Sequence, residues 1–239
     1  MAHPLAGVDA KIDRGFEHLA ELEAEVGAFF RDKPYRIVHK PDKKPGWHVA
    51  VFRIDREPPI RLGLVAGEAF GQFRSALDHL MSQLIIIRRP QTAGKTHENF
   101  PICDERVKFM GASGNGPSSR IRKAVRPAHF ALVKSLQPYQ PVKRDPTGRL
   151  SEQAALALIQ WFTNLDKHEL VRPGFFAAQT VRIHHDSNIS GWDWLMDPET
   201  NLQNETRLYR AQFVDKSKMD MSQPMRFTVD LTFGTWHCC

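Results

Sequence analysis

The stretch that decides the fold is "IRLGLVAGEAFGQFRSALDHLMSQLIII", residues 60–87. Apolar residues recur along it at intervals of three and four, which is the repeat of one face of an α-helix. Two arginines and a proline follow at 88–90, and this combination is typical of a helix end. We therefore predict a long helix over 60–87, with an apolar face made of Leu62, Val65, Ala69, Phe73, Leu77, Leu80, Leu84 and Ile87.

Other segments on the N-terminal side are also helical, apart from one hairpin. Residues 9–31 show the same three-four repeat, a short basic helix broken at Pro127 is predicted within 120–136, and another helix opens at Ser151. The segments "YRIVHK" (35–40) and "WHVAVFRI" (47–54) are joined by the turn-rich "PDKKPG". This pattern predicts a β-hairpin inserted between two helices.

The periodicity changes after residue 173. The segments "TVRI" (180–183), "RLYRAQFV" (207–214) and "RFTVDLTF" (226–233) alternate apolar and polar residues, which predicts strands. Helices followed by strands favour an α+β fold over a βαβ arrangement. We expect a helical bundle over 1–172, with the hairpin at about 35–55, and an antiparallel β region over 173–239 packed on it as one structural unit.

Composition is that of a globular protein. The chain has 239 residues, 41% hydrophobic and 25% charged. It begins without an apolar signal region, and no apolar run reaches the length of a membrane helix, so we expect no membrane association. Its three cysteines (Cys103, Cys238 and Cys239) form no disulfide framework, which favours a reducing cytoplasm.

Positive charge is concentrated between Arg106 and Arg149. This segment holds ten Lys or Arg and only one acid, Asp145, while the whole chain carries +6. Such a segment could bind RNA or another polyanion. A solvated basic surface is the alternative, because aromatic residues for base stacking are not interleaved with the cations. The candidate nucleic-acid-binding residues are Arg120, Arg122, Lys123, Arg126, Lys143 and Arg144.

A glycine-rich stretch, "GASGNGPS" (111–118), lies in the same segment. Its two outer glycines have the spacing of a phosphate-binding loop, but Pro117 stands where that loop needs a lysine. We expect no helix to follow, and nucleotide hydrolysis is excluded. Nucleophilic catalysis is equally disfavoured, because Cys103 has no local partner and the chain lacks a Gly-x-Ser-x-Gly turn.

Two polar clusters interrupt the helical patterns, in "FRSALDHL" (73–80) and "NLDKHEL" (164–170). Arg74 and Asp78 are four apart and can pair on one helix face, whereas His79 lies about 140° around the helix from Arg74. Across the two helices, the candidate polar-cluster residues are Asp78, Asn164, Asp166, Lys167 and His168. It could tie neighbouring helices together, or it could supply metal ligands between two helices. Because no His-Glu-x-x-His or Cys-x-x-Cys motif is present, we predict no metal and no cofactor.

Together these segments resemble a bacterial and phage family without an assigned activity. The family has an "NLRSALDHL"-type helix, then "FPI", then an "NIDKHR"-type helix end. This chain has "QFRSALDHL" at 72–80, "NFPI" at 99–102 and "NLDKHEL" at 164–170, in the same order. The resemblance covers about residues 10–172. Gln72 and Glu169 depart from the family pattern, which has Asn and Arg at these positions.

A more distant resemblance is to the HEPN superfamily of helical bundles. Many of its members are metal-independent ribonucleases that use an Arg-x4–6-His motif across a dimer, and Arg74 and His79 match that spacing. The resemblance implies a homodimer in which His79 acts as general acid or base and Arg74 stabilises charge at the phosphorus. Ser75 and the mid-helix position depart from the usual motif.

Two classes of function therefore stand side by side. The first is a cytoplasmic, non-enzymatic interaction or regulatory module in which Arg74, Asp78, Asn164 and His168 share one hydrogen-bond network. The second is a HEPN-type endoribonuclease with Arg74 and His79 in a basic groove. A metal-binding helical bundle is the remaining alternative.

Overall fold

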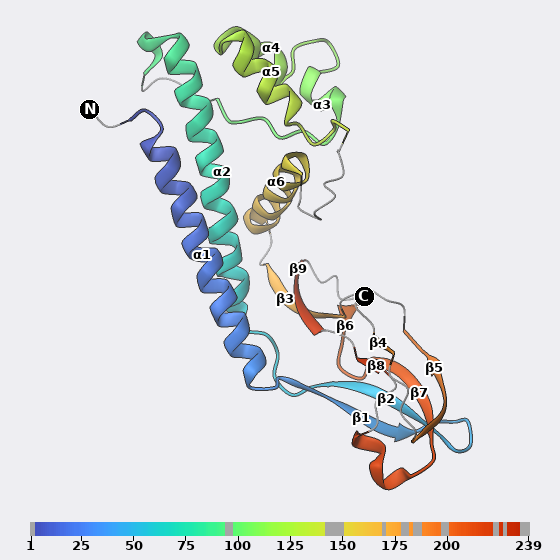
Figure 1. Ribbon diagram of the computed structural model, residues 1–239. Helices are drawn as coiled ribbons and strands as arrows, with labels where there is room; N and C mark the ends of the chain where they lie inside the picture. The colour runs from blue at the N-terminus through green and yellow to red at the C-terminus, as the bar shows by residue number, and fades with distance from the viewer. Residues whose placement is uncertain are drawn as a thin grey trace. The chain divides into compact units, whose positions relative to one another are not determined.

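The protein has an α+β fold with antiparallel sheets, as expected from the order of its helical and strand patterns (Figure 1). The computed structural model describes residues 3–93, 98–141, 151–168, 171–177, 182–183, 188–196, 201–221, 225–226 and 229–234. Among the helices in these ranges, none has the long apolar run that crossing a lipid bilayer requires.

Apart from α3, which no periodic pattern predicted, the helices fall close to the predicted ranges. The long helix predicted at 60–87 is α2. Of its predicted apolar face, Leu62, Val65 and Ala69 are buried, but Ile87 is exposed. In the second half of α2 the buried residues are Ala76, Met81 and Ile85. The basic helix predicted within 120–136 is divided at Pro127 between α4 and α5, because proline is favoured in the first turn of a new helix. The bounds are α1 (Ala6–Arg31), α2 (Ile60–Arg88), α3 (Arg106–Met110), α4 (Pro117–Ala124), α5 (Pro127–Ser135) and α6 (Glu152–His168), with 3-10 turns η1 (Pro90–Thr92) and η2 (Lys216–Met221).

The strands form one sheet of four strands and two smaller sheets. The strand orders are β1-β2-β7-β5, β6-β3-β9 and β4-β8, and all the pairs are antiparallel. The bounds are β1 (Tyr35–Pro41), β2 (Trp47–Ile54), β3 (Arg172–Ala177), β4 (Arg182–Ile183), β5 (Ile189–Trp194), β6 (Asn201–Leu202), β7 (Arg207–Phe213), β8 (Met225–Arg226) and β9 (Val229–Gly234).

The chain divides into two compact units, each built from two separate segments. Unit 1 comprises Met1–Glu21 and Leu64–Leu170, and unit 2 comprises Leu22–Gly63 and Val171–Cys239. This division differs from the predicted one at 172, because the hairpin groups with the later strands and not with the helices. The hairpin groups with the later strands because the edge of β2 that does not pair with β1 has free backbone N–H and C=O groups. These groups pair with β7 from Trp47 to Val51.

The core of unit 1 lies between α2, the short helices and the first half of α6. It contains Met81, Ile85, Phe100, Ile121, Val125, Val133 and Leu156. Nearer the end of α6, Phe70 of α2 stacks on Phe162 with 4.0 Å between ring centroids. At Gly67 the helices approach so closely that a Cβ atom would lie 2.5 Å from Oδ1 of Asp166.

The core of unit 2 brings together residues of the four-stranded sheet, the last turn of α1, and strands β3 and β6. It contains Phe29, Ala50, Phe52, Phe175, Met196, Leu202, Leu208, Tyr209, Ala211 and Phe213. The alternation of "WHVAVFRI" accounts for this arrangement only in part, because residues 49–52 are all buried. Both faces of β2 are therefore covered in its middle.

The glycine-rich stretch differs from expectation, because a helix follows it directly. Helix α4 begins at Pro117, with Gly116 in extended backbone as its N-cap. Gly111 and Gly116 touch backbone to backbone, and a Cβ atom on Gly111 would lie 2.3 Å from the Gly116 nitrogen. Gly111 also has a φ of 77°, so glycine is required there on two grounds.

Candidate functional site

Arg74 and Asp78 form the centre of a hydrogen-bond network inside unit 1. Nη2 of Arg74 donates to Oδ1 of Asp78 at 3.0 Å and to the carbonyl oxygen of Phe100 at 2.8 Å. The same Oδ1 accepts the backbone N–H of Phe100 at 2.9 Å. The pair therefore holds the "FPI" segment against α2 through both polar groups of the Phe100 backbone.

The network continues to α6 through a residue that the sequence did not single out. Nη1 of Arg74 donates to Oε1 of Gln160 at 3.2 Å, and Nε2 of Gln160 donates to Oδ1 of Asn164 at 2.9 Å. The structure thus connects Arg74, Asp78 and Asn164 through Gln160, while the side chain of His168, the fourth member of the predicted network, lies outside the described residues. Gln160 could have been predicted from its position four residues before Asn164, because residues four apart on a helix lie on the same face.

His79 lies away from this network. Its ring faces the start of α1, where a Cβ atom on Gly7 would be 3.6 Å from Nδ1 of His79. The guanidinium of Arg74 instead points to α6 and the Phe100 backbone. One copy of the chain therefore does not bring Arg74 and His79 together, in agreement with their angular separation on the helix.

The second polar cluster is only partly joined to the first. Asp166 packs against the backbone of Gly67, and Lys167 is exposed. His168 is the last residue of α6, and its side chain lies outside what the structure describes. In the described part of the chain, no group of three or more His, Cys, Asp or Glu side chains is arranged to hold a metal ion. His184, His185 and Asp186, three neighbouring residues of metal-ligating types, lie outside that part.

Gln137 anchors the continuation of the "FPI" segment, and sequence analysis did not identify it. Its side chain is fully buried. Oε1 accepts the backbone N–H of Cys103 at 3.0 Å, and Nε2 donates to the carbonyl oxygens of Pro101 and Val133, both at 2.9 Å. Burial raises the pKa of the neighbouring Cys103 thiol. A buried thiol with a raised pKa is a poor nucleophile, which agrees with the structural role expected for Cys103.

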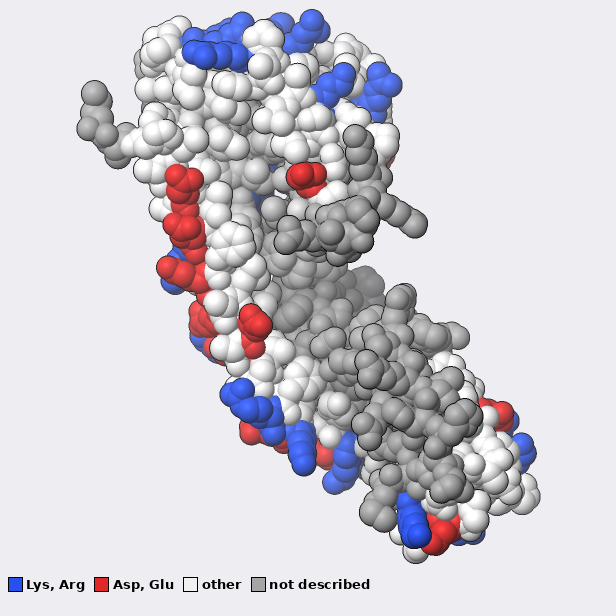
Figure 2. All heavy atoms as spheres, viewed as in Figure 1, with Lys and Arg blue, Asp and Glu red and all other residues white. Residues whose placement is uncertain are grey.

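Basic side chains gather at one end of unit 1. Figure 2 shows blue atoms over the region that carries α4, α5 and the end of α2 in Figure 1. We call this surface the basic end; it is formed by the exposed residues Arg88, Arg89, Arg120, Arg122, Lys123, Arg126 and Lys134. Arg120 pairs with Glu98 at 3.4 Å. In the described part of the chain, the other six have no carboxylate partner. Lys143 and Arg144, also predicted here, lie outside the described residues.

Arg88 and Arg89 have a different role from the one that their position at the end of α2 suggests. The guanidinium of Arg88 donates to the carbonyl oxygens of Arg122 and Val125, and that of Arg89 donates to Lys123 O at 2.8 Å. These carbonyls lie at the C-terminal end of α4, where a helix has no internal donors for them. The two arginines therefore cap a neighbouring helix and are held in place by it.

Acidic residues occupy a different surface of unit 1. Asp9, Asp13, Glu17 and Glu21 follow one another at every fourth position of α1 and so form a row along one face. The row is visible as red atoms along one side of the molecule in Figure 2. The acidic row makes this face of α1 less favourable to a polyanion than the basic end is.

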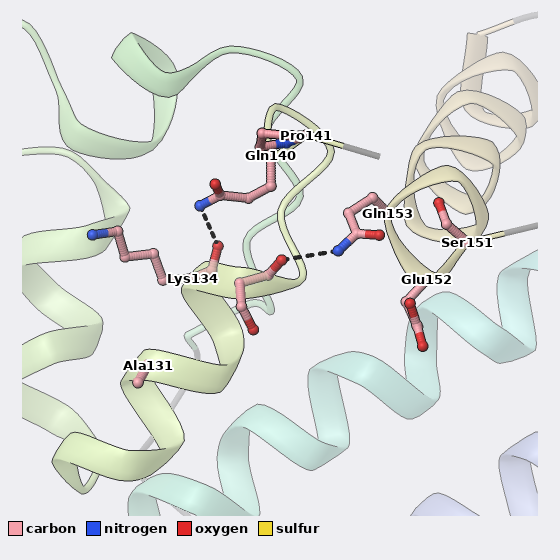
Figure 3. Close-up of a pocket in the computed structure, with 8 residues that line it drawn as sticks. Ala131, Lys134, Gln140, Pro141, Ser151, Glu152 and Gln153 are labelled. Carbon is pink, nitrogen blue, oxygen red and sulfur yellow. Dashed lines mark hydrogen bonds between the residues drawn. The ribbon is translucent and has the colours of Figure 1, made fainter. Parts of the chain in front are cut away.

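A pocket between the end of α5 and the start of α6 has its two glutamine and two serine side chains in structural hydrogen bonds (Figure 3). Its volume is about 620 Å³. Nε2 of Gln140 donates to Lys134 O and Nε2 of Gln153 donates to Ser135 O, each at 3.0 Å. Both glutamines thus cap the C-terminal end of α5. We assign this pocket to the packing of the two helices.

Comparison of the chain with known protein families, with curated proteins and with solved structures finds no match. The resemblances to the phage family and to HEPN proteins therefore stay predictions, and the functional argument rests on the geometry of unit 1.

Proposed function

We propose that the protein is a non-enzymatic module that binds RNA through the basic end of unit 1. The observation that carries the proposal is the set of six exposed cations, on or next to α2, α4 and α5, that have no described carboxylate partner. A surface of this kind neutralises backbone phosphates without reading base sequence, and each phosphate it neutralises releases counterions.

The polar network around Arg74 supports the non-enzymatic part of the proposal. Its guanidinium already donates to three acceptors, and its side chain is only 16% exposed. An arginine that stabilises a transition state needs donors directed at the substrate. Here the donors are directed at Asp78, Gln160 and the Phe100 backbone, so the arrangement favours a structural role.

The test is the binding of the full chain to a fluorescent single-stranded RNA over a series of salt concentrations. We expect a linear fall of log K with log salt, with a slope of about 0.7 for each phosphate neutralised. The double variant Arg122→Gln/Lys123→Gln should bind more weakly and with a lower slope. Lys43→Gln/Lys216→Gln removes two exposed charges from unit 2 and should bind like the wild type.

Two results would contradict the proposal. One is the absence of salt-dependent binding, and the other is an equal loss of binding in the unit 2 control. The same samples test the alternative function if the integrity of the RNA is followed in the presence of EDTA. Cleavage that is lost in His79→Ala would favour the HEPN-type endoribonuclease and would overturn the non-enzymatic assignment.

A further inference from the structure

A second pocket of unit 1 lies within the basic end and has the character of an anion site. Its volume is about 490 Å³, and it runs along one face of α4 between the ends of α2 and α5. Arg88, Arg122, Lys123 and Lys134 contribute four cationic side chains, and Ser118 and Ser119 add hydroxyl groups from the first turn of α4. The described lining contains neither Asp nor Glu.

The pocket is held in shape by contacts that are independent of any ligand. The guanidinium of Arg88 is fixed by the carbonyl oxygens of Arg122 and Val125. Gly111 and Gly116 close the loop that delivers the start of α4, with the Gly116 N–H donating to Met110 O at 3.0 Å. Nη1 of Arg88 is occupied by the carbonyls of Arg122 and Val125, but its positive charge is thereby held beside the pocket, and a charge that is already positioned loses little entropy when an anion binds.

The charge of the pocket exceeds what one backbone phosphate requires. A phosphodiester carries a single negative charge, whereas a terminal phosphomonoester carries about −1.5 to −2 at neutral pH and offers three acceptor oxygens. Four cations and two hydroxyls around one concave site therefore match a monoester better than a diester. Arginine adds paired N–H donors that fit phosphate oxygens.

The pocket is large enough, and its remaining wall apolar enough, for a ligand larger than a phosphate ion. Met110 and Phe130 supply apolar surface, and Met110 is 40% exposed. Pockets of 300–1,000 Å³ are typical of small organic ligands. Phe130 packs partly against the core and also lines the pocket, so it places an aromatic side chain where a base would lie; stacking of this kind does not depend on base identity.

We propose that this pocket binds the phosphomonoester at an end of an RNA strand, together with the terminal nucleotide. The inference rests on the proposed function, since it assigns the strand end to the pocket and the internal phosphates to the surrounding basic end. The shared chemistry is a terminal phosphate, which occurs at either a 5′ or a 3′ end.

The test compares the binding of the full chain to one RNA sequence prepared in three forms, with a 5′-phosphate, with a 3′-phosphate and with hydroxyl groups at both ends. We expect one phosphorylated form to bind about tenfold more tightly than the hydroxyl form, as one added charge-assisted interaction requires. Lys134→Gln removes an exposed cation of the pocket and should abolish this preference. Arg126→Gln removes an exposed cation of the basic end outside the pocket and should weaken all three forms equally.

The outcomes separate the two proposals. Binding of all three forms with equal affinity would overturn the end-binding inference and leave the RNA-binding function intact. A preference that survives in Lys134→Gln would overturn the assignment to this pocket. If none of the three RNAs binds, the proposed function fails, and the end-binding inference fails with it.

Discussion

Replacing Asp78 by alanine tests whether the Arg74–Asp78 pair is structural. The change removes the oxygen that accepts hydrogen bonds from Nη2 of Arg74 at 3.0 Å and from the backbone N–H of Phe100 at 2.9 Å. It leaves the guanidinium without its counter-charge and the amide without an acceptor. The "FPI" segment then loses one of its two backbone attachments to α2.

The expected cost follows from the number of bonds and their exposure. Hydrogen bonds to charged groups contribute about 1.5–3 kcal/mol each, and a fully buried pair that loses one partner is destabilised by about 3–5 kcal/mol. The side chains here are 16% and 30% exposed, so water replaces part of what is lost. We therefore expect Asp78→Ala to lower the free energy of unfolding by about 3 kcal/mol. Asp78→Asn keeps one acceptor and should cost about 1 kcal/mol.

The assay is urea unfolding followed by far-ultraviolet circular dichroism, with hydrogen exchange of the Phe100 amide as a local readout. Asp104→Ala is the matched control, because Asp104 also pairs with a cation four residues away, but at exposures of 53% for Lys108 and 69% for Asp104. Such exposed pairs contribute about 0.5 kcal/mol or less. If Asp78→Ala costs no more than Asp104→Ala, or if exchange at Phe100 is unchanged, the structural assignment of the pair is refuted.

Three further predictions concern other buried or paired groups. Gln137→Ala should lower the free energy of unfolding by about 3 kcal/mol, because the Cys103 amide and two carbonyls lose their partners; urea unfolding measures this. In a chain whose two C-terminal cysteines are serine, Cys103 should react with iodoacetamide at mildly alkaline pH more slowly than a free thiol does, because burial raises its pKa; faster reaction than that of free cysteine would contradict this. The backbone N–H of Lys43 and the guanidinium of Arg207 hold the pKa of Asp42 below its usual range. The contribution of Asp42 is therefore complete above about pH 4 and is lost as the pH falls through its lowered value, so stability measured against pH should fall less steeply in acid for Asp42→Asn than for the wild type.

Local patterns in the sequence predicted the hairpin and every helix except the five-residue α3 within a few residues, because hydrophobic periodicity depends on neighbours three or four positions apart. Strand β3 was missed for a definable reason. The first strand predicted after the helices begins at 180, whereas β3 begins at Arg172 and contains Pro173 and Gly174, two residues that are typical of breaks between elements. Pro173 is opposite Phe233 of β9, while β6 pairs only with Phe175 and Phe176, so no second neighbour needs the missing N–H of the proline.

For the candidate sites too, the sequence predicted one part and missed another. Lysines and arginines can be counted in the sequence, so the basic segment was identified, but its pocket was not. Arg88 reaches the carbonyl of Val125, 37 residues away, and Lys134 enters the pocket from a different helix. In the sequence, Gly111, Gly116 and Pro117 show only that the phosphate-binding loop motif is incomplete. In the structure, the two glycines form the turn that leads into α4, and α4 forms one wall of the pocket.

The sequence by itself determined the α+β class, the main helices, the hairpin and the concentration of positive charge. These follow from short-range periodicity and from composition, which need no knowledge of how the elements pack. Only the tertiary structure decided that the hairpin joins the later strands, that Arg74 pairs with Phe100 and Gln160 while His79 points elsewhere, and that four cations line one pocket. The periodicity of a helix does not reveal which residue a polar side chain will bind in another element. The partner of Arg74 on α6, Gln160, is 86 residues away in the chain.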